Sequence, residues 1–169
     1  MKLKFMITLL LLICSVFTRA QLNNKLSKLI FDKVVMYDFE GGKGIALHII
    51  DEKGNLAKTV KKEIVLSKET IKELNLKLGK IKSYGGPTSA CFEPHLGFVY
   101  YLKNNVVGHL TFCLDCNRLS SSIRLPALEQ EKVEYNHEVY YSIDGLSESF
   151  RKYLYQLITK YDFSHGIKK

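Results

Sequence analysis

Three of the four cysteines fall in one short segment, which contains Cys91-Phe-Glu-Pro-His95 and, further along, Cys113-Leu-Asp-Cys116. Thiolates and imidazoles bind soft or borderline metal ions such as zinc, and thiols also form disulfides or act as nucleophiles. No other segment of the sequence combines residue types and spacings that suggest chemistry beyond packing. The segment therefore predicts a functional site, with metal binding as the first interpretation.

The two halves of the segment are expected to meet through a β-hairpin. Residues 97–103 and 106–113 are rich in β-branched and aromatic side chains, which favour strands. Asn104-Asn105 between them is predicted to form a two-residue turn, because asparagine tolerates a positive φ. With that turn, Cys113 stands opposite Leu96, at the end of the hairpin that also carries the other candidate ligands.

This register predicts a Cys3His site that can hold one zinc ion in tetrahedral geometry. The four predicted ligands are Cys91, His95, Cys113 and Cys116. Because four protein ligands close the coordination shell of zinc, the predicted role of the metal is structural rather than catalytic. No catalytic residue is assigned, and the sequence leaves open whether the protein is an enzyme.

Two other interpretations of the same cysteines stay open. In an oxidising compartment neighbouring thiols form disulfides, and a bond from Cys91 to Cys113 or Cys116 would staple its loop to the hairpin. Alternatively, Cys113 and Cys116 are reactive thiols. They form a redox pair, with Arg118 and Arg124 as sources of positive charge near a thiolate, or one of them is the nucleophile of a Cys–His hydrolase with His95 or another histidine as base. No amphipathic helix pattern follows the pair, unlike in thioredoxin-type sites, and Asn117 replaces the histidine of a haem-attachment motif.

The first twenty residues, 1–20, have the layout of a secretory signal peptide. Lys2 and Lys4 precede a short apolar stretch, and Thr18-Arg19-Ala20 offers a cleavage site after Ala20. The stretch is too short to span a hydrocarbon core of roughly 30 Å, and no later stretch is long and apolar enough. We therefore expect a periplasmic or extracellular protein with residues 21–169 as a single domain.

Positive charge is dispersed over the sequence. Cleavage after Ala20 removes three of the 25 basic residues and no acidic ones, which leaves 22 against 17 and a net charge of +5. The lysines do not alternate with aromatic residues in the way typical of a nucleic-acid surface, so no nucleic-acid partner is expected. Cleavage also leaves three cysteines, an odd number that cannot form a complete disulfide framework.

Hydrophobic patterns predict an α+β domain with a mostly antiparallel sheet and two packed helices. The first helix, about 67–79, begins at Ser67 as N-cap, and the second, about 146–161, carries an apolar stripe along one face. Residues 84–87 are expected to form an irregular loop. Besides the hairpin, the expected strands are 33–39, 44–51, 56–66 and 133–143.

The cysteine segment resembles one found in an uncharacterised family of exported bacterial proteins of the Bacteroidetes type. The residues that carry the resemblance are Cys91-Phe-Glu-Pro-His95, Gly97-Phe-Val-Tyr-Tyr101 and Phe112-Cys-Leu-Asp-Cys-Asn117. The resemblance implies a bacterial source and a shared Cys-x-x-Pro-His and Cys-x-x-Cys site. It implies no activity.

Together these features predict an exported small domain whose cysteine site, holding zinc or a disulfide, is structural. The domain would then serve a binding role toward an unknown protein or small ligand. The alternative function is a thiol redox or metal-handling protein that uses Cys113 and Cys116.

Overall fold

The computed structural model describes residues 26–42, 44, 46–125, 132–135, 138–141 and 145–164, with only the backbone course for 132–135 and 138–141. The predicted signal peptide, residues 1–20, lies outside the described residues. Among those described, no helix has the length and apolar character needed to cross a bilayer.

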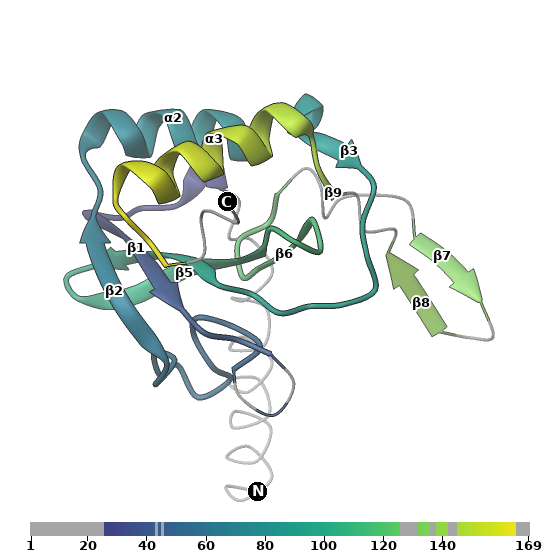
Figure 1. The fold of residues 1–169 in the computed structure, drawn as a ribbon, viewed down its shortest axis with the longest axis horizontal. Coiled ribbons are helices and arrows are strands. Elements are labelled where there is room, and N and C mark those ends of the chain that lie inside the picture. The colour runs from purple at the N-terminus through teal and green to yellow at the C-terminus, as the bar shows by residue number, and fades with distance from the viewer. Residues whose placement is uncertain are drawn as a thin grey trace, which may run out of the picture.

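A five-stranded antiparallel sheet forms the centre of the fold (Figure 1). Its strand order is β2-β1-β4-β5-β6, and every neighbouring pair is antiparallel. The strands are β1 (Lys33–Phe39), β2 (Val60–Val65), β4 (Leu96–Leu102), β5 (Asn105–Cys113) and β6 (Arg118–Ser121). The α+β class and the antiparallel sheet predicted from the sequence are confirmed.

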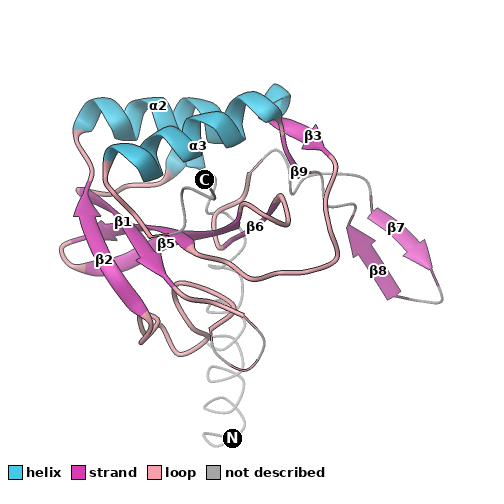
Figure 2. Ribbon diagram, viewed as in Figure 1, coloured by secondary structure: helices cyan, strands magenta, loops and turns pink. Residues whose placement is uncertain are grey.

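Two helices, α2 (Lys68–Leu78) and α3 (Glu148–Lys160), lie side by side over one face of this sheet (Figure 2). Each begins at a serine whose hydroxyl accepts a hydrogen bond from the first turn: Ser67 from the Thr70 N–H and Ser147 from the Phe150 N–H. Such caps satisfy backbone donors that have no partner within the helix. Single 3-10 turns lie at Leu26–Lys28 (η2) and Ile81–Ser83 (η3).

The main hydrophobic core lies between the helices and the sheet. Alternate strand residues such as Met36, Phe98 and Phe112 are fully buried there against helix residues such as Phe150 and Leu154. Because side chains alternate across a strand, the same strands present a second set of residues to the opposite face.

The segment between β1 and β2 covers that opposite face. Ile49 packs over Gly97, where an added Cβ would lie 2.5 Å from Ile49 Cγ1, and the Ile49 N–H donates to Thr111 Oγ1 at 3.0 Å. The predicted strand at 44–51 is wrong for the residues described there: the segment has only an isolated bridge between Ile50 and Leu56. Its backbone bonds to a strand side chain and to itself instead of to a neighbouring strand.

Two short ribbons complete the fold. The predicted loop at 84–87 contains β3 (Tyr84–Gly86), which pairs with β9 (Gly145–Leu146), so α3 begins later than predicted. The single strand predicted at 133–143 is wrong: β7 (Lys132–Tyr135) and β8 (Glu138–Tyr141) form a separate hairpin beside the main sheet (Figure 1).

The β4–β5 hairpin forms as predicted, but its turn and register differ. Lys103 and Asn104 occupy the turn, with φ of 50° and 66°, and Leu102 pairs with Asn105. After an irregularity next to Tyr101, Leu96 pairs with Phe112, not with Cys113. At this end of the hairpin the predicted register is one residue out, yet the same ends of the two strands come together.

Candidate functional site

The structure brings Cys91, Cys113 and Cys116 to one point. Their three sulfur atoms all lie within 4.8 Å of one another, and no other His, Cys, Asp or Glu side chain of the described residues belongs to this group. Cys113 and Cys116 are buried, whereas Cys91 is exposed. Thiols arranged in this way can form a disulfide or hold a metal ion.

Cys116 is the sulfur common to two pairs. It lies within bonding distance of both Cys91 and Cys113, with Cα–Cα distances of 5.8 Å and 5.3 Å. Both distances fall in the range that a disulfide spans, roughly 4.4–6.8 Å. A sulfur can be bonded to one partner sulfur only, so the two pairings exclude each other.

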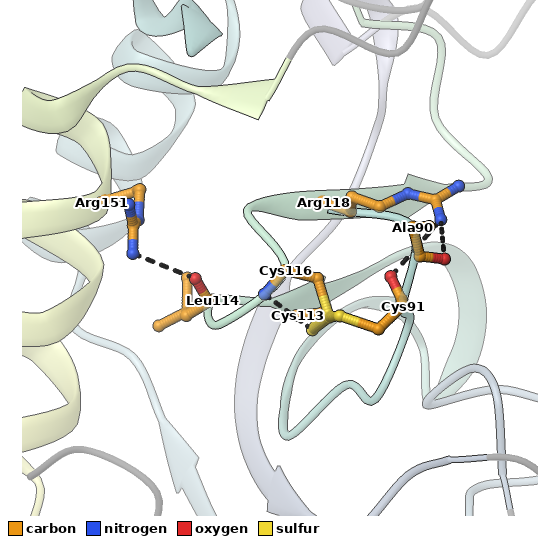
Figure 3. Close-up of a disulfide and its surroundings, with 7 residues drawn as sticks. All are labelled: Ala90, Cys91, Cys113, Leu114, Cys116, Arg118 and Arg151. Carbon is orange, nitrogen blue, oxygen red and sulfur yellow. Dashed lines mark hydrogen bonds between the residues drawn. A yellow bond between two sulfur atoms is a disulfide. The ribbon is translucent and has the colours of Figure 1, made fainter. Parts of the chain in front are cut away.

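Hydrogen bonds hold the loop of Cys91 against the β5–β6 turn, and Figure 3 shows those made by Arg118. Ser89 N–H donates to the Cys116 carbonyl at 2.9 Å, and His95 N–H donates to the Phe112 carbonyl at 3.2 Å. From β6, Arg118 Nη1 donates to the carbonyls of Ala90 and Cys91 at 3.2 Å and 3.4 Å. The sulfur of Cys91 is thus held near the turn by contacts that involve no sulfur.

Asn117 fastens this turn to two further segments, a role that the sequence did not reveal. It is buried, has a φ of 52°, and its Nδ2 donates to the carbonyls of Pro87 at 2.8 Å and Leu146 at 2.9 Å. Its Oδ1 accepts from the Leu146 N–H at 3.2 Å. An asparagine directly after Cys-x-x-Cys could have signalled a left-handed turn position, because asparagine is enriched there.

The turn itself donates to one of its sulfurs. Cys116 N–H points at Cys113 Sγ at 3.2 Å, which favours negative charge on that sulfur (Figure 3). On the far side of the turn, Arg151 of α3 donates from Nη2 to the Leu114 carbonyl at 3.2 Å. The Cys-x-x-Cys turn is therefore fixed from the loop side and from the helix side.

Arg118 also brings a positive charge to the loop. Its guanidinium carbon lies 5.6 Å from the ring centre of Phe92, and the His48 ring lies 6.2 Å from Phe92 on the same loop. A cation close to a thiol favours the thiolate. Arg118 contacts the Cys91 carbonyl, so its charge lies beside the loop of this cysteine, and its effect on a thiolate stays a prediction.

His95 does not join the group of three sulfurs. Its side chain lines a small cavity with Asp38, Leu96, Asp115 and Phe163 at the end of α3. Asp38 is buried there, and its Oδ2 accepts from Ser164 N and Oγ at 2.7 Å and 2.8 Å. The Cys3His ligand set therefore stays a prediction, and the arrangement supports its three cysteines best.

The other histidines do not join the thiol group either. His48 and His109 are close enough that the charge of His48 contributes to lowering the pKa of His109, after the larger effect of burial. The Nδ1 atoms of both imidazoles are buried without a hydrogen-bond partner among the described residues. His137 and His165 lie outside the described residues.

Comparison of the chain with protein-family models, with curated proteins and with solved structures found no match. The site must therefore be interpreted from its own residues.

Proposed function

We propose that Cys91, Cys113 and Cys116 bind one metal ion, with zinc as the first candidate, and that this centre is structural. The observation that carries the proposal is the convergence of all three sulfurs. A single disulfide uses two thiols and gives no reason for a third to lie beside them. A thiolate-bound metal uses all three, and thiolate is a preferred ligand of zinc.

The metal would connect two segments that are distant in the sequence. Cys91 belongs to the loop before β4, whereas Cys113 and Cys116 bracket the β5–β6 turn. The Cys116 N–H donating to Cys113 Sγ supports a thiolate at that position, as metal binding requires. Binding energy would then contribute directly to folding.

We further propose that the domain is exported and that its binding role is carried by surfaces other than the metal. Cysteines within disulfide distance and an N-terminal sequence with signal-peptide layout support export. The resemblance of the cysteine segment to exported Bacteroidetes-type proteins agrees with it. The partner, a protein or a small ligand, has no signature among the described residues.

Elemental analysis together with a thiol count tests the metal proposal. Protein purified without chelator is expected to hold about one zinc per chain, with the three thiols unreactive until the metal is removed. Replacing Cys113 by Ser should abolish zinc retention, and Ser122→Ala, an exposed change directly after β6, should leave it intact. A metal-free protein with one disulfide would overturn the proposal.

The histidine is tested separately. His95→Ala is expected to weaken zinc retention if the fourth ligand is this imidazole. Unchanged zinc content would remove His95 from the ligand set and leave a three-cysteine centre whose fourth position is open to a water or an exogenous ligand.

A redox function is the second candidate. It is favoured by one observation: Cys116 lies between two alternative partners, and the outer of them, Cys91, is exposed. In thiol–disulfide exchange an accessible thiol receives the external partner and a buried thiol resolves the mixed disulfide.

A further inference from the structure

The geometry points to a thiol–disulfide exchange centre in which Cys116 is the shared sulfur and Cys91 the point of contact with an external thiol or disulfide. This inference rests on the three-cysteine centre proposed above and adds what its metal-free form does. The substrate class is a partner with two thiols that can approach the exposed loop of Cys91.

Two oxidised forms fit the same backbone. A local form bonds Cys113 to Cys116, three residues apart, and a long-range form bonds Cys91 to Cys116, 25 residues apart. Because the Cα–Cα distances of both pairs suit a disulfide and all three sulfurs lie within 4.8 Å, the third sulfur is always beside the bond that it would attack.

The exchange between these forms is balanced without any added reagent. The Cys91 thiolate attacks Cys116 Sγ, the Cys91–Cys116 bond forms, and the Cys113–Cys116 bond breaks with its electron pair on Cys113. Cys113 is the suitable leaving group because its sulfur accepts the Cys116 N–H at 3.2 Å.

The long-range form then reacts with the partner. A partner thiolate attacks Cys91 Sγ, which forms a mixed disulfide and releases Cys116 as a thiolate. The partner's second thiol displaces Cys91, so the partner is oxidised to a disulfide and this protein takes up two electrons and two protons. Cys91 is the only one of the three cysteines that is exposed, which makes it the entry point.

The loop stays in place while its sulfur is unbonded. Ser89, Arg118 and His95 connect it to the β5–β6 region through backbone carbonyls and N–H groups. Cys91 is therefore presented to Cys116 in the reduced state too, which keeps the exchange intramolecular and fast compared with a free thiol.

Disulfide mapping tests the inference on the full chain. The protein is stripped of metal with EDTA, equilibrated in glutathione buffers of several oxidised-to-reduced ratios, quenched in acid and alkylated. Cleavage after Lys103 and before Asp115 separates Cys91, Cys113 and Cys116 onto different peptides. Both the Cys91–Cys116 and the Cys113–Cys116 peptides are expected, with glutathione bound to Cys91.

Two variants sharpen the test. Cys91→Ser should slow reaction with glutathione at least tenfold, because only buried thiols remain. Ser122→Ala is the matched control: it is an exposed change that keeps all three thiols, and its glutathione reaction should stay within a few-fold of the wild type.

A single pairing at every glutathione ratio, or glutathione on Cys113 or Cys116 of the wild type, would overturn the inference even if the variants fail to fold. The zinc content of the reduced protein is measured on a portion of the same preparation that is set aside before EDTA is added. Bound zinc with a single disulfide pairing would support the metal proposal and contradict the exchange inference. Two disulfide pairings without bound zinc would support the exchange inference and contradict the metal proposal.

Discussion

Asn117 shows how one side chain can set the geometry of the whole site. It bonds to Pro87 and twice to Leu146, and it occupies the left-handed position that ends the Cys-x-x-Cys turn. These contacts join the loop before Cys91, the entry to α3 and the turn that carries two sulfurs. The site therefore depends on an amide that offers no chemistry of its own.

Asn117→Ala is expected to lower the free energy of unfolding by about 2–4 kcal/mol, from three lost hydrogen bonds and the buried groups that they leave unpaired. Denaturant unfolding measures the change. Asn117→Gly loses the same bonds but tolerates the positive φ, so it should be less destabilising than the alanine variant. A loss below about 0.5 kcal/mol in both variants would contradict this role.

His109 gives a pH dependence of stability. Burial, and to a lesser degree the charge of His48, lowers the pKa of His109 below its ordinary value of 6.5. As the pH falls below about 6.5, His109 is protonated in the unfolded chain before it is protonated in the folded protein. The free energy of unfolding therefore decreases from that pH down to the lowered pKa of His109 in the folded protein.

Urea unfolding between pH 7.5 and 5 (roughly one unit above and more than one below the ordinary histidine pKa) measures this effect. His109→Gln should lose less stability than the wild type over that interval. An identical pH dependence in the two proteins would show that His109 does not carry it.

At the level of elements, the hairpin illustrates what the sequence can and cannot predict. Strands β1, β2, β4 and β5, the α+β class and the two helices follow from alternation, helical spacing and the Ser67 cap, which are local signals. The predicted turn, Asn104-Asn105, lies one residue after the observed one, Lys103-Asn104. Asparagine adopts a positive φ more readily than lysine does, so the sequence favours the two asparagines. Packing of both sheet faces fixes the register instead.

The segment 40–59 and strand β6 were beyond a local prediction for the same reason. Ile49 packs into the space that Gly97 leaves free, and β6 forms by pairing with β5; both are tertiary effects. The convergence of the three sulfurs could be predicted, because any hairpin with its turn near residue 104 brings together the strand ends that lie next to the cysteines. The position of His95 in the cavity beside Asp38 could not be predicted, because it depends on how α3 ends.

Two substitutions with opposite expected effects on the free energy of unfolding test the position of the turn. Lys103→Asn should raise the free energy of unfolding by about 0.5–1 kcal/mol, because asparagine adopts the left-handed region more readily than lysine. Asn105→Gly should lower it by a similar amount, because residue 105 belongs to a strand, where glycine is unfavourable. If Asn105→Gly stabilises the protein in thermal unfolding, the turn lies where the sequence first suggested.

At the scale of the whole molecule, the two pairings of Cys116 constrain the unfolded chain to different degrees. A disulfide across 25 residues is expected to stabilise by roughly 3.5 kcal/mol and one across three residues by roughly 2 kcal/mol. Cys113→Ser isolates the first pairing and Cys91→Ser the second.

Denaturant unfolding of each variant with and without reductant, in the presence of EDTA, measures these contributions. The larger loss on reduction is expected for Cys113→Ser. Equal losses would mean that the loop of Cys91 stays near the turn in the unfolded chain.

The unequal spacing of the cysteines also has a consequence for how the chain reaches this fold. Short loops close sooner than long ones, so an oxidant acting on the newly made chain would join Cys113 and Cys116 before the segment of Cys91 has docked. The early disulfide does not block folding, because the Cys91 thiol can attack it once its loop has docked and so exchange it for the Cys91–Cys116 bond. Because Cys116 is shared by both pairs, the disulfides can form in the same order as the contacts of the fold. The rearrangement from the first to the second disulfide then needs no separate isomerase.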